Sequence, residues 1–489
     1  MLIYSLSKID YLAYKAENMR IVIFFVLVNL CITNSMYSQE IYYLEGSSRK
    51  ISQLVGDFDN ELHVSTSNLT YQNYQIWGTD LGISFQHKGK TYLLFGDIPG
   101  DSGFGSDRDP IAYTEDNNPN DGIDLSFIVQ SPGLYNPLTI PGISQGAFEV
   151  PLDGISINDT MYIYHSTDNM TRSILARSSN DGFSFDLIED TISIEHFINI
   201  SVNRIKRSDF PDLPGTFENG LLLLGSGMYR NSAVYLSCQA EDSISFKESM
   251  YYFAGYSGQR PLWSRSEEDA VPVIDINCVG ELSAAFNPHL QKWLILYNCD
   301  DPRGVLFRTS DVPWGPYSTG EILFDPWEDD AYCSFMHVSW EHLNCDSVHD
   351  PNRKNEWGGE YGPYMFKEMS VKVDSLVDIY YTLSIWNPYT TVLMKSTLVK
   401  PDKHGTGSKS FERNKFHINP NPTSDRFQIS SADMVESKLE ITLFTSTGSL
   451  VISKKYSREI DLSNFPTGIY YGQIIYNNEY HSSFKIVKN

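Results

Sequence analysis

Short apolar runs broken by turn residues dominate the chain from about residue 39 to residue 400. Val, Ile, Leu, Tyr and Phe gather in brief stretches, and Gly, Asn, Asp and Pro separate one stretch from the next. No long segment in this region repeats with the 3.6-residue period of a helix. This pattern is typical of short strands joined by tight turns and predicts an all-β fold.

A hairpin of similar character recurs within the same region. Hairpins are expected at 78–97, 151–166, 201–227, 280–298 and 361–387, and shorter strands are expected to follow near residues 111, 174, 232, 305 and 391. Sheets that repeat in this way close into a ring in a propeller, which protects their edges. The repeats therefore predict a five-bladed β-propeller.

The two ends of the chain differ from the repeats. Residues 1–38 are interpreted as an over-extended start and a signal peptide that begins at Met19, because Arg20 precedes a short apolar run at 21–32. That run is shorter than the roughly 20 apolar residues that span a bilayer. We expect the propeller at 39–399, a polar, flexible linker at 400–415, and a small immunoglobulin-like β-sandwich at 416–489.

Charge and missing motifs exclude several classes of function. The chain has 37 Lys and Arg against 61 Asp and Glu, a formal net charge of −24. This acidity argues against nucleic acid or an anionic membrane surface as the main partner, since phosphate binding needs a basic surface. The chain contains no serine-hydrolase elbow, P-loop or dinucleotide-binding glycine motif in a fitting context.

The cysteines fit an exported protein. Cys278 and Cys299 flank the hairpin at 280–298, whose turn lies nearly midway between them, so their sulfurs are expected on facing strands and a disulfide is predicted. Cys333 and Cys345 are placed to close a short loop. Cys238 is expected to be a buried thiol.

The last part of the chain carries four blocks in order. These are NPNPT at 419–423 followed by Phe427, FTSTGSLV at 444–451, the stretch from Asp461 to Tyr470, and KIVK at 485–488. This segment resembles the type A C-terminal sorting domain of the type IX secretion system of Bacteroidetes. The resemblance implies that the type IX machinery exports the protein, which is then released or attached to the outer cell surface. The alternative is a β-sandwich of unrelated purpose.

Candidate chemistry is expected where the inner strands of the propeller end, because loops at one end of the ring gather side chains from every blade. Carboxylates at such positions are Asp80, Asp97, Glu149, Asp153 and Glu281. Hydrolysis of a glycosidic bond needs one carboxylic acid and one carboxylate. Aromatic side chains able to stack on sugar rings, and an arginine able to bond hydroxyl groups, accompany them at Trp77, Tyr229, Arg230, Tyr361 and Trp386.

Several of the same motifs carry a family resemblance. The run at 78–97, EVPLDG at 149–154, MYR at 228–230, GELS at 280–283 and the stretches YGPYMF and LSIWNPY resemble the secreted family catalogued as domain of unknown function 4185. The family consists of five-bladed propellers and includes endo-D-arabinanases, so the resemblance implies a glycoside hydrolase. By this analogy Asp80 is the expected base or nucleophile, Glu149 and Glu281 compete for the acid, and Asp97 and Asp153 are second-line candidates.

Other interpretations of these features remain open. A lectin or adhesin on the same propeller, without catalysis, is the main alternative to a hydrolase acting on a neutral polysaccharide such as an arabinan, and a scaffold for protein partners is a third. The carboxylates have structural alternatives, such as turn formation for Asp153 or ion pairing for Glu281. No cofactor is indicated, although Asp101, Asp107 and Asp109 offer oxygens for Ca²⁺ in a loop that is otherwise a solvated turn.

Overall fold

A computed structural model describes residues 41–488 except 101–107, 339–347, 402–416, 431–438, 446–449, 456–458 and 477–478. The expected signal peptide, most of the expected linker, and Cys345 therefore lie outside the described residues. Strands dominate the described residues, and the helical segments among them are short. The all-β prediction is confirmed. Among the described residues, no helix has the length and hydropathy of a membrane span.

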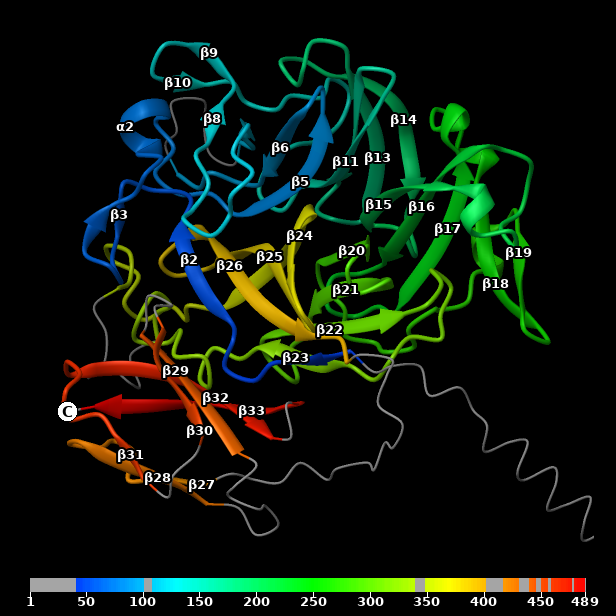
Figure 1. Ribbon diagram of the computed structural model, residues 1–489. Helices are drawn as coiled ribbons and strands as arrows, with labels where there is room; N and C mark the ends of the chain where they lie inside the picture. Colours follow the sequence, from blue (N-terminus) through cyan, green and yellow to red (C-terminus); the bar gives the residue numbers. More distant parts are fainter. Residues whose placement is uncertain are drawn as a thin grey trace, which may run out of the picture.

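Residues 42–399 contain five antiparallel sheets of four or five strands (Figure 1). The first sheet comprises β5 (Leu81–His87), β6 (Lys90–Phe95), β7 (Ile111–Thr114) and β8 (Ser126–Phe127). The second comprises β11 (Pro151–Ile157), β12 (Thr160–Thr167), β13 (Arg172–Ser178) and β14 (Asp186–Ser193). The third comprises β15 (Asn199–Lys206), β16 (Asn219–Ser226), β17 (Val234–Ala240), β18 (Tyr251–Ser257) and β19 (Arg260–Ser264).

The last two sheets complete this region. The fourth comprises β20 (Leu282–Asn287), β21 (Lys292–Asn298), β22 (Val305–Ser310) and β23 (Glu321–Phe324). The fifth comprises β24 (Glu360–Val373), β25 (Leu376–Ile385) and β26 (Thr390–Val399), and β26 also pairs with the N-terminal strands β1 (Tyr42–Tyr43) and β2 (Arg49–Gln53). The two ends of this region thus share one sheet, which holds them together without a covalent link.

The sheets form a closed ring around their first strands. β5 contacts β11, β11 contacts β15, β15 contacts β20, β20 contacts β24, and β24 contacts β5, and the labels of these strands surround the centre of Figure 1. Five separate apolar layers fill the spaces between neighbouring sheets. The layer between the third and fourth sheets, for example, includes Leu222, Leu236 and Trp293. Because each sheet buries both faces against its neighbours, the ring fixes the positions of its first strands.

Smaller elements lie outside these sheets. The short strands β3 (Phe58–Asp59) and β4 (Val64–Ser65) pair with each other, as do β9 (Val129–Ser131) and β10 (Leu134–Tyr135), and α2 (Thr70–Tyr74) is a single short helix. Cys278 and Cys299 form the expected disulfide across the ends of the β20–β21 hairpin. Cys238 is a buried free thiol, as expected.

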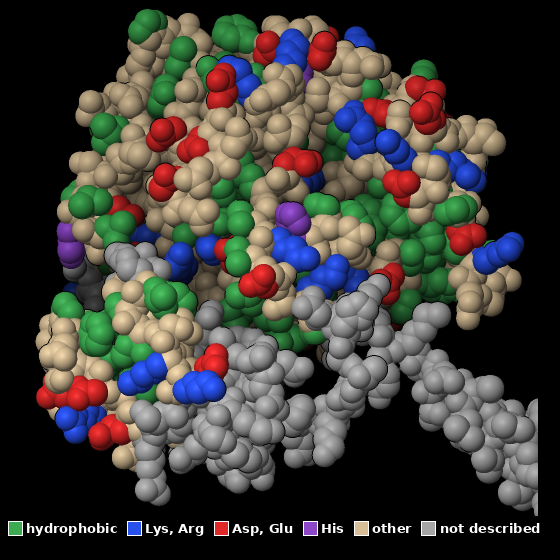
Figure 2. Space-filling view, viewed as in Figure 1, with side chains coloured by type: hydrophobic (Ala, Val, Ile, Leu, Met, Phe, Trp, Pro, Cys, Tyr) green, Lys and Arg blue, Asp and Glu red, His purple; other side chains and the backbone are tan. Residues whose placement is uncertain are grey.

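The C-terminal segment forms two further sheets beside the ring (Figure 1). One contains β27 (His417–Asn419), β28 (Arg426–Ser430) and β31 (Ile460–Asp461), and the other contains β29 (Leu439–Thr445), β30 (Leu450–Lys455), β32 (Gly468–Tyr476) and β33 (Glu479–Lys488). A core of its own, with Phe427, Ile441 and Ile474, lies between them. Acidic and basic side chains are interspersed on the face of the molecule seen in Figure 2.

Candidate functional site

Four of the predicted site residues lie where first strands of the ring begin. Asp80 directly precedes β5, Glu281 directly precedes β20, Tyr361 is the second residue of β24, and Glu149 lies two residues before β11. β24 contacts both β5 and β20, and β5 also contacts β11. The ring therefore gathers these residues in the order Glu281, Tyr361, Asp80 and Glu149, although they are far apart in the sequence.

Asp80 is a buried carboxyl group that binds a proton unusually well. Its Oδ2 accepts a hydrogen bond of 2.8 Å from the Tyr361 hydroxyl, whereas its buried Oδ1 has no hydrogen-bond partner among the described residues. Burial raises the pKa of Asp80 to about 6, and the negative charge of Glu281 adds to this effect, while hydrogen bonds from Tyr389 and Tyr361 oppose it. A carboxyl group with this pKa exchanges protons near neutral pH.

Glu281 is the second buried carboxyl group of the site. Burial raises its pKa, and the positive charge of Arg230 and a hydrogen bond from Tyr229 oppose the increase. Its Oε2 is buried and has no hydrogen-bond partner in the described part of the chain. Arg230 is held in place by Asp300, with 2.5 Å between Nη1 and Oδ1, and its guanidinium lies 5.1 Å from the centre of the Tyr229 ring. Glu281 is thus supported by both of the neighbouring residues that the sequence singled out.

Two buried tyrosines are sensitive to both carboxyl groups. Burial raises the pKa of Tyr361 and Tyr364 well above the ordinary value, and the charges of both Asp80 and Glu281 raise these pKa values further. Each tyrosine therefore lies within electrostatic range of both carboxylates. Asp80 and Glu281 form one electrostatically coupled group on either side of β24.

An aromatic surface adjoins Asp80. The rings of Trp77 and Trp386 lie 6.0 Å and 5.7 Å from the ring of Tyr389, and both tryptophans are more than a third exposed. The Trp77 indole nitrogen donates to the Pro99 carbonyl at 2.9 Å, which fixes the orientation of its ring. Exposed, oriented aromatic faces beside buried carboxyl groups are suited to binding the apolar face of a sugar ring.

Glu149 and Asp97 lie on the other side of Asp80. Glu149 Oε1 accepts a hydrogen bond of 2.7 Å from the backbone N–H of Asn169, and Asp97 Oδ2 accepts one of 3.2 Å from that of Phe148. The Tyr389 hydroxyl lies 3.2 Å from the Asp97 carbonyl oxygen and also lowers the pKa of Asp80, so this hydroxyl adjoins both residues. Both carboxylates remain near the group, and backbone donors engage each of them.

Asp153 is placed differently from the other candidates. Its Oδ2 accepts hydrogen bonds from Lys367 at 2.6 Å, Val202 N–H at 2.8 Å and Ser201 at 3.1 Å, and its Oδ1 accepts one from Gly154 N–H at 2.8 Å. This buried ion pair ties β11 to β15 and β24. The structure thus gives Asp153 a set of bonds that hold the ring together, although its charge also raises the pKa of Tyr364.

Backbone strain accompanies the site. Leu81, directly after Asp80, has a φ of 65°, Phe148, directly before Glu149, has a φ of 73°, and Arg230 has a φ of 51°. These are left-handed conformations that residues with a side chain rarely adopt and that cost of order 1–3 kcal/mol each. Strain of this kind persists where the surrounding structure imposes it, often at functional sites.

Tyr389 and Gly96 lie in motifs that the sequence pointed to, LSIWNPY and the run at 78–97, but neither residue was given a role of its own. Tyr389 directly precedes β26, the third strand of its sheet. The Gly96 N–H donates to the Asp80 carbonyl at 3.0 Å, and a Cβ at Gly96 would collide with Asp80 Oδ1. The sequence did carry a signal for Gly96, which follows an apolar strand in the motif FGD, because a glycine at such a place often marks a close approach of other atoms.

Of the three aspartates that offered oxygens for Ca²⁺, Asp109 alone lies among the described residues, since Asp101 and Asp107 fall outside them. Asp109 Oδ2 is 3.1 Å from His165 Nε2 in a fully buried pair. Burial lowers the pKa of His165 to about 4. No group of three or more His, Cys, Asp or Glu side chains suited to a metal ion occurs in the described ranges.

Comparison with family models gives two matches. One model, described as a domain of unknown function (DUF4185), matches residues 65–395. The other, described as a secretion system C-terminal sorting domain, matches residues 417–489. The first match covers the ring of sheets with Asp80, Glu149, Glu281 and Tyr361, and the second covers the C-terminal sheets. No curated protein matches the chain.

Solved structures also share similarity with the chain at low identity. A GH43 beta-xylosidase/alpha-arabinofuranosidase from a compost microbial metagenome is 12% identical, with a TM-score of 0.39 over 68% of this chain and 96% of that chain. The alpha-L-arabinofuranosidase of Podospora anserina is 11% identical, with a TM-score of 0.38 over 73% and 99% of the two chains.

Proposed function

We propose, from the premise that the chain belongs to the family described as domain of unknown function (DUF4185), that it is a glycoside hydrolase acting on a neutral polysaccharide such as an arabinan. The observation that carries the proposal is the coupled pair Asp80 and Glu281, two buried carboxyl groups whose pKa values are both raised. Such a pair offers one group as acid and one as base near neutral pH.

The proposal gives each residue a role. Asp80 is the base or nucleophile, because the hydroxyls of Tyr361 and Tyr389 stabilise its ionised form. Glu281 is the general acid, and Glu149 is the alternative acid on the opposite side of Asp80. Trp77 and Trp386 stack on sugar rings, and Arg230 and Tyr229 orient Glu281 while they bind sugar hydroxyls.

We also propose how the domains of the chain are built. The closed contacts among β5, β11, β15, β20 and β24 support a five-bladed propeller at 39–399, and the two C-terminal sheets around one core support an immunoglobulin-like sandwich at 416–489. Residues 1–38 are then the start and signal peptide, and residues 400–415 are the linker. A propeller brings its carboxylates together at one end of the axis, as glycoside hydrolysis requires.

The C-terminal domain directs the export of the protein. The chain carries a secretion system C-terminal sorting domain, so it is secreted or attached to the outer cell surface. The type IX secretion machinery is the corresponding partner. A polysaccharide outside the cell is then the substrate within reach, and the net charge of −24 favours a neutral polymer over a polyanion.

Digestion of a glycan panel tests the proposed function. The recombinant chain is incubated with D-arabinan, arabinose-rich polymers and unrelated neutral polysaccharides, and new reducing ends and product sizes are measured. We expect products from an arabinan. Binding of a glycan without any hydrolysis, at equal affinity in wild type and Asp80→Asn, would instead identify a lectin or adhesin.

The pH dependence of hydrolysis provides a second prediction. Because Asp80 acts in its ionised form and burial raises its pKa to about 6, kcat/KM is expected to fall as the pH decreases below about 6. The measurement is kcat/KM on the polysaccharide from about pH 4 to about pH 8. Full activity maintained down to about pH 4 would contradict the role of Asp80, since an ordinary aspartate ionises near that pH.

Gly96→Ala tests the geometry of the site. The added Cβ would collide with Asp80 Oδ1, so the carboxylate must turn away from the Tyr361 hydroxyl. We expect kcat to fall by about 10²-fold, because small misplacements of a reacting group have effects of this size. The control is the double variant with Asp80→Asn: if Gly96→Ala acts through Asp80, it causes no further loss in that background.

A further inference from the structure

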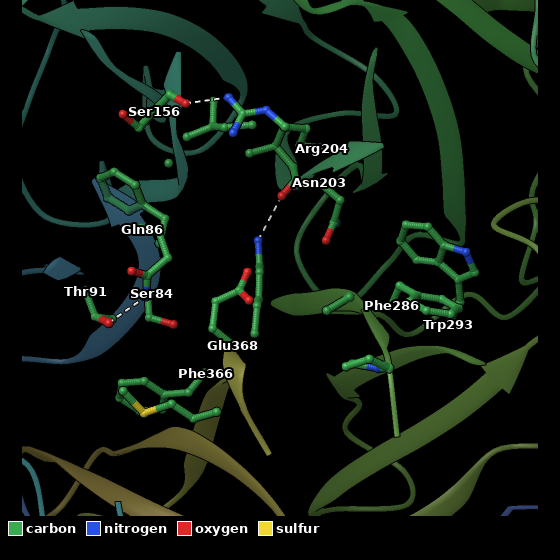
Figure 3. Close-up of a pocket in the computed structure, with 18 residues that line it drawn as sticks. Ser84, Gln86, Thr91, Ser156, Asn203, Arg204, Phe286, Trp293, Phe366 and Glu368 are labelled. Atoms are coloured by element: carbon green, nitrogen blue, oxygen red, sulfur yellow. Dashed lines mark hydrogen bonds between the residues drawn. The ribbon is translucent and has the colours of Figure 1, made fainter. Parts of the chain in front are cut away.

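A hollow, drawn in Figure 3, lies at the end of the ring opposite the coupled carboxyl groups. Its volume is about 360 Å³, and its walls come from later positions of all five first strands, such as Gln86, Ser156, Arg204, Phe286 and Glu368. Because Asp80 and Glu281 precede β5 and β20, this cavity and the coupled carboxyl groups lie at opposite ends of the same strands. Its size falls within the range of small-molecule sites, about 300–1,000 Å³.

The cavity is polar but nearly neutral. Lys367 is paired with Asp153 at 2.6 Å, and Arg204 is paired with Glu241 at 2.5 Å. Lys367 Nζ also donates to the Val202 carbonyl at 2.9 Å, and Arg204 donates to the Ser156 carbonyl at 2.5 Å (Figure 3). Both cations are thus already neutralised, and the exposed Glu368 adds one negative charge. These charges favour a ligand without net charge over an anion.

Accessible polar side chains stand in the wall of the cavity. Gln86 and Glu368 both line it, and both are exposed. A sugar hydroxyl can donate a hydrogen bond as well as accept one, so it can bond the Gln86 amide and the Glu368 carboxylate.

An aromatic face completes the cavity. Phe286 is 40% exposed, and its ring centre lies 6.1 Å from that of the buried Trp293. Figure 3 shows Phe286 and Trp293 together on one side of the hollow, with Asn203 and Arg204 beside them. An exposed ring held by a buried ring provides a rigid apolar platform next to hydrogen-bond donors.

We propose that this cavity is a second carbohydrate-binding site, which takes the end or a short segment of a neutral glycan. A sugar has the features that the cavity selects: no net charge, hydroxyl groups for Gln86 and Glu368, and an apolar face for Phe286. The choice of an arabinan as the glycan rests on the proposed function, whereas the existence of the site rests on the cavity. A polymer bound in this cavity stays on the protein and leaves the coupled carboxyl groups at the other end of the ring accessible.

Calorimetric titration of the full chain tests the proposal. Short D-arabino-oligosaccharides are titrated into Asp80→Asn, in which hydrolysis is blocked, and two binding sites are expected. Adding Phe286→Ala weakens one of them about tenfold or more, since loss of an aromatic contact of about 1.4 kcal/mol changes affinity tenfold. Phe246→Ala, which removes another exposed ring, is the matched control and leaves both sites intact.

Gln86→Ala separates ligand binding from a structural role. Because Gln86 is exposed, its replacement is expected to leave the midpoint of thermal unfolding nearly unchanged while it weakens the same site. Two sites that persist unchanged in Phe286→Ala and Gln86→Ala, or a single site from the start, would overturn the proposal. Binding at the second site by a chain that hydrolyses no glycan would support this inference and refute only the hydrolase.

Discussion

Replacing Asp80 by Asn lowers kcat for hydrolysis of the polysaccharide by about 10³- to 10⁴-fold in our expectation, while the affinity for the glycan stays nearly unchanged. The amide has nearly the shape of the carboxylate and still accepts the hydrogen bond from Tyr361, but it neither takes a proton nor attacks a sugar carbon. Initial rates and binding titrations on the same glycan measure the two effects separately.

The same variant is expected to be more stable than the wild type at neutral pH. Burial raises the pKa of Asp80 from 3.8 to about 6, so the native state binds its proton more tightly than the unfolded state. Ionised Asp80 therefore destabilises the fold above about pH 6, by an amount on the order of 3 kcal/mol, and this cost disappears below about pH 4. Chemical denaturation of both proteins, above about pH 6 and below about pH 4, measures the difference in their free energy of unfolding. The variant should be the more stable protein only at the higher pH.

A surface variant provides the control for Asp80→Asn. Asp212 is exposed, so Asp212→Asn is expected to change neither kcat nor stability. If Asp80→Asn hydrolyses the glycan at the wild-type rate, the assignment of Asp80 is wrong. If it loses both hydrolysis and stability, its carboxylate has a structural role instead.

Replacing Glu281 by Gln is expected to reduce kcat on the polysaccharide by about 10²- to 10⁴-fold, because the leaving oxygen then departs without a proton. The loss should be much smaller on a nitrophenyl glycoside, whose leaving group needs no protonation. Asp80→Asn should be impaired on both substrates. The ratio of the two rates therefore distinguishes the acid from the base or nucleophile.

Two further variants make this result specific. Glu218→Gln changes an exposed glutamate and is expected to retain full activity on both substrates. Glu149→Gln tests the alternative acid on the other side of Asp80. A selective loss on the polysaccharide in Glu149→Gln, with normal rates in Glu281→Gln, would transfer the role of acid to Glu149.

The strands were predictable because their signal is local. The hairpin expected at 280–298 corresponds to β20 and β21, and the hairpin expected at 361–387 corresponds to β24 and β25. Alternation of apolar and polar residues, and turn residues such as Asn287 and Pro288, act over a few neighbouring positions. The disulfide between Cys278 and Cys299 was predictable for the same reason, because one hairpin places both cysteines.

The partners of the site residues were less accessible to sequence analysis. Asp80 and Asp153 both lie at the start of a predicted hairpin, yet Asp80 faces tyrosines and Asp153 faces Lys367. Nothing near either aspartate indicates this difference, since Tyr361 and Lys367 come from β24, far away in the sequence. Gly96 and Tyr389 lie in motifs that the sequence pointed to, but their effects on Asp80 were not predictable because these contacts cross from one strand or sheet to another.

The sequence by itself determined the all-β character, the place of the main hairpins, the family and the sorting domain, since these depend on local patterns and on motifs that stay contiguous along the chain. Only the tertiary structure decided which carboxyl groups are coupled and which one is neutralised by a lysine. The pKa of a side chain depends on burial and on charges a few ångströms away, and in this fold those charges belong to other sheets of the ring.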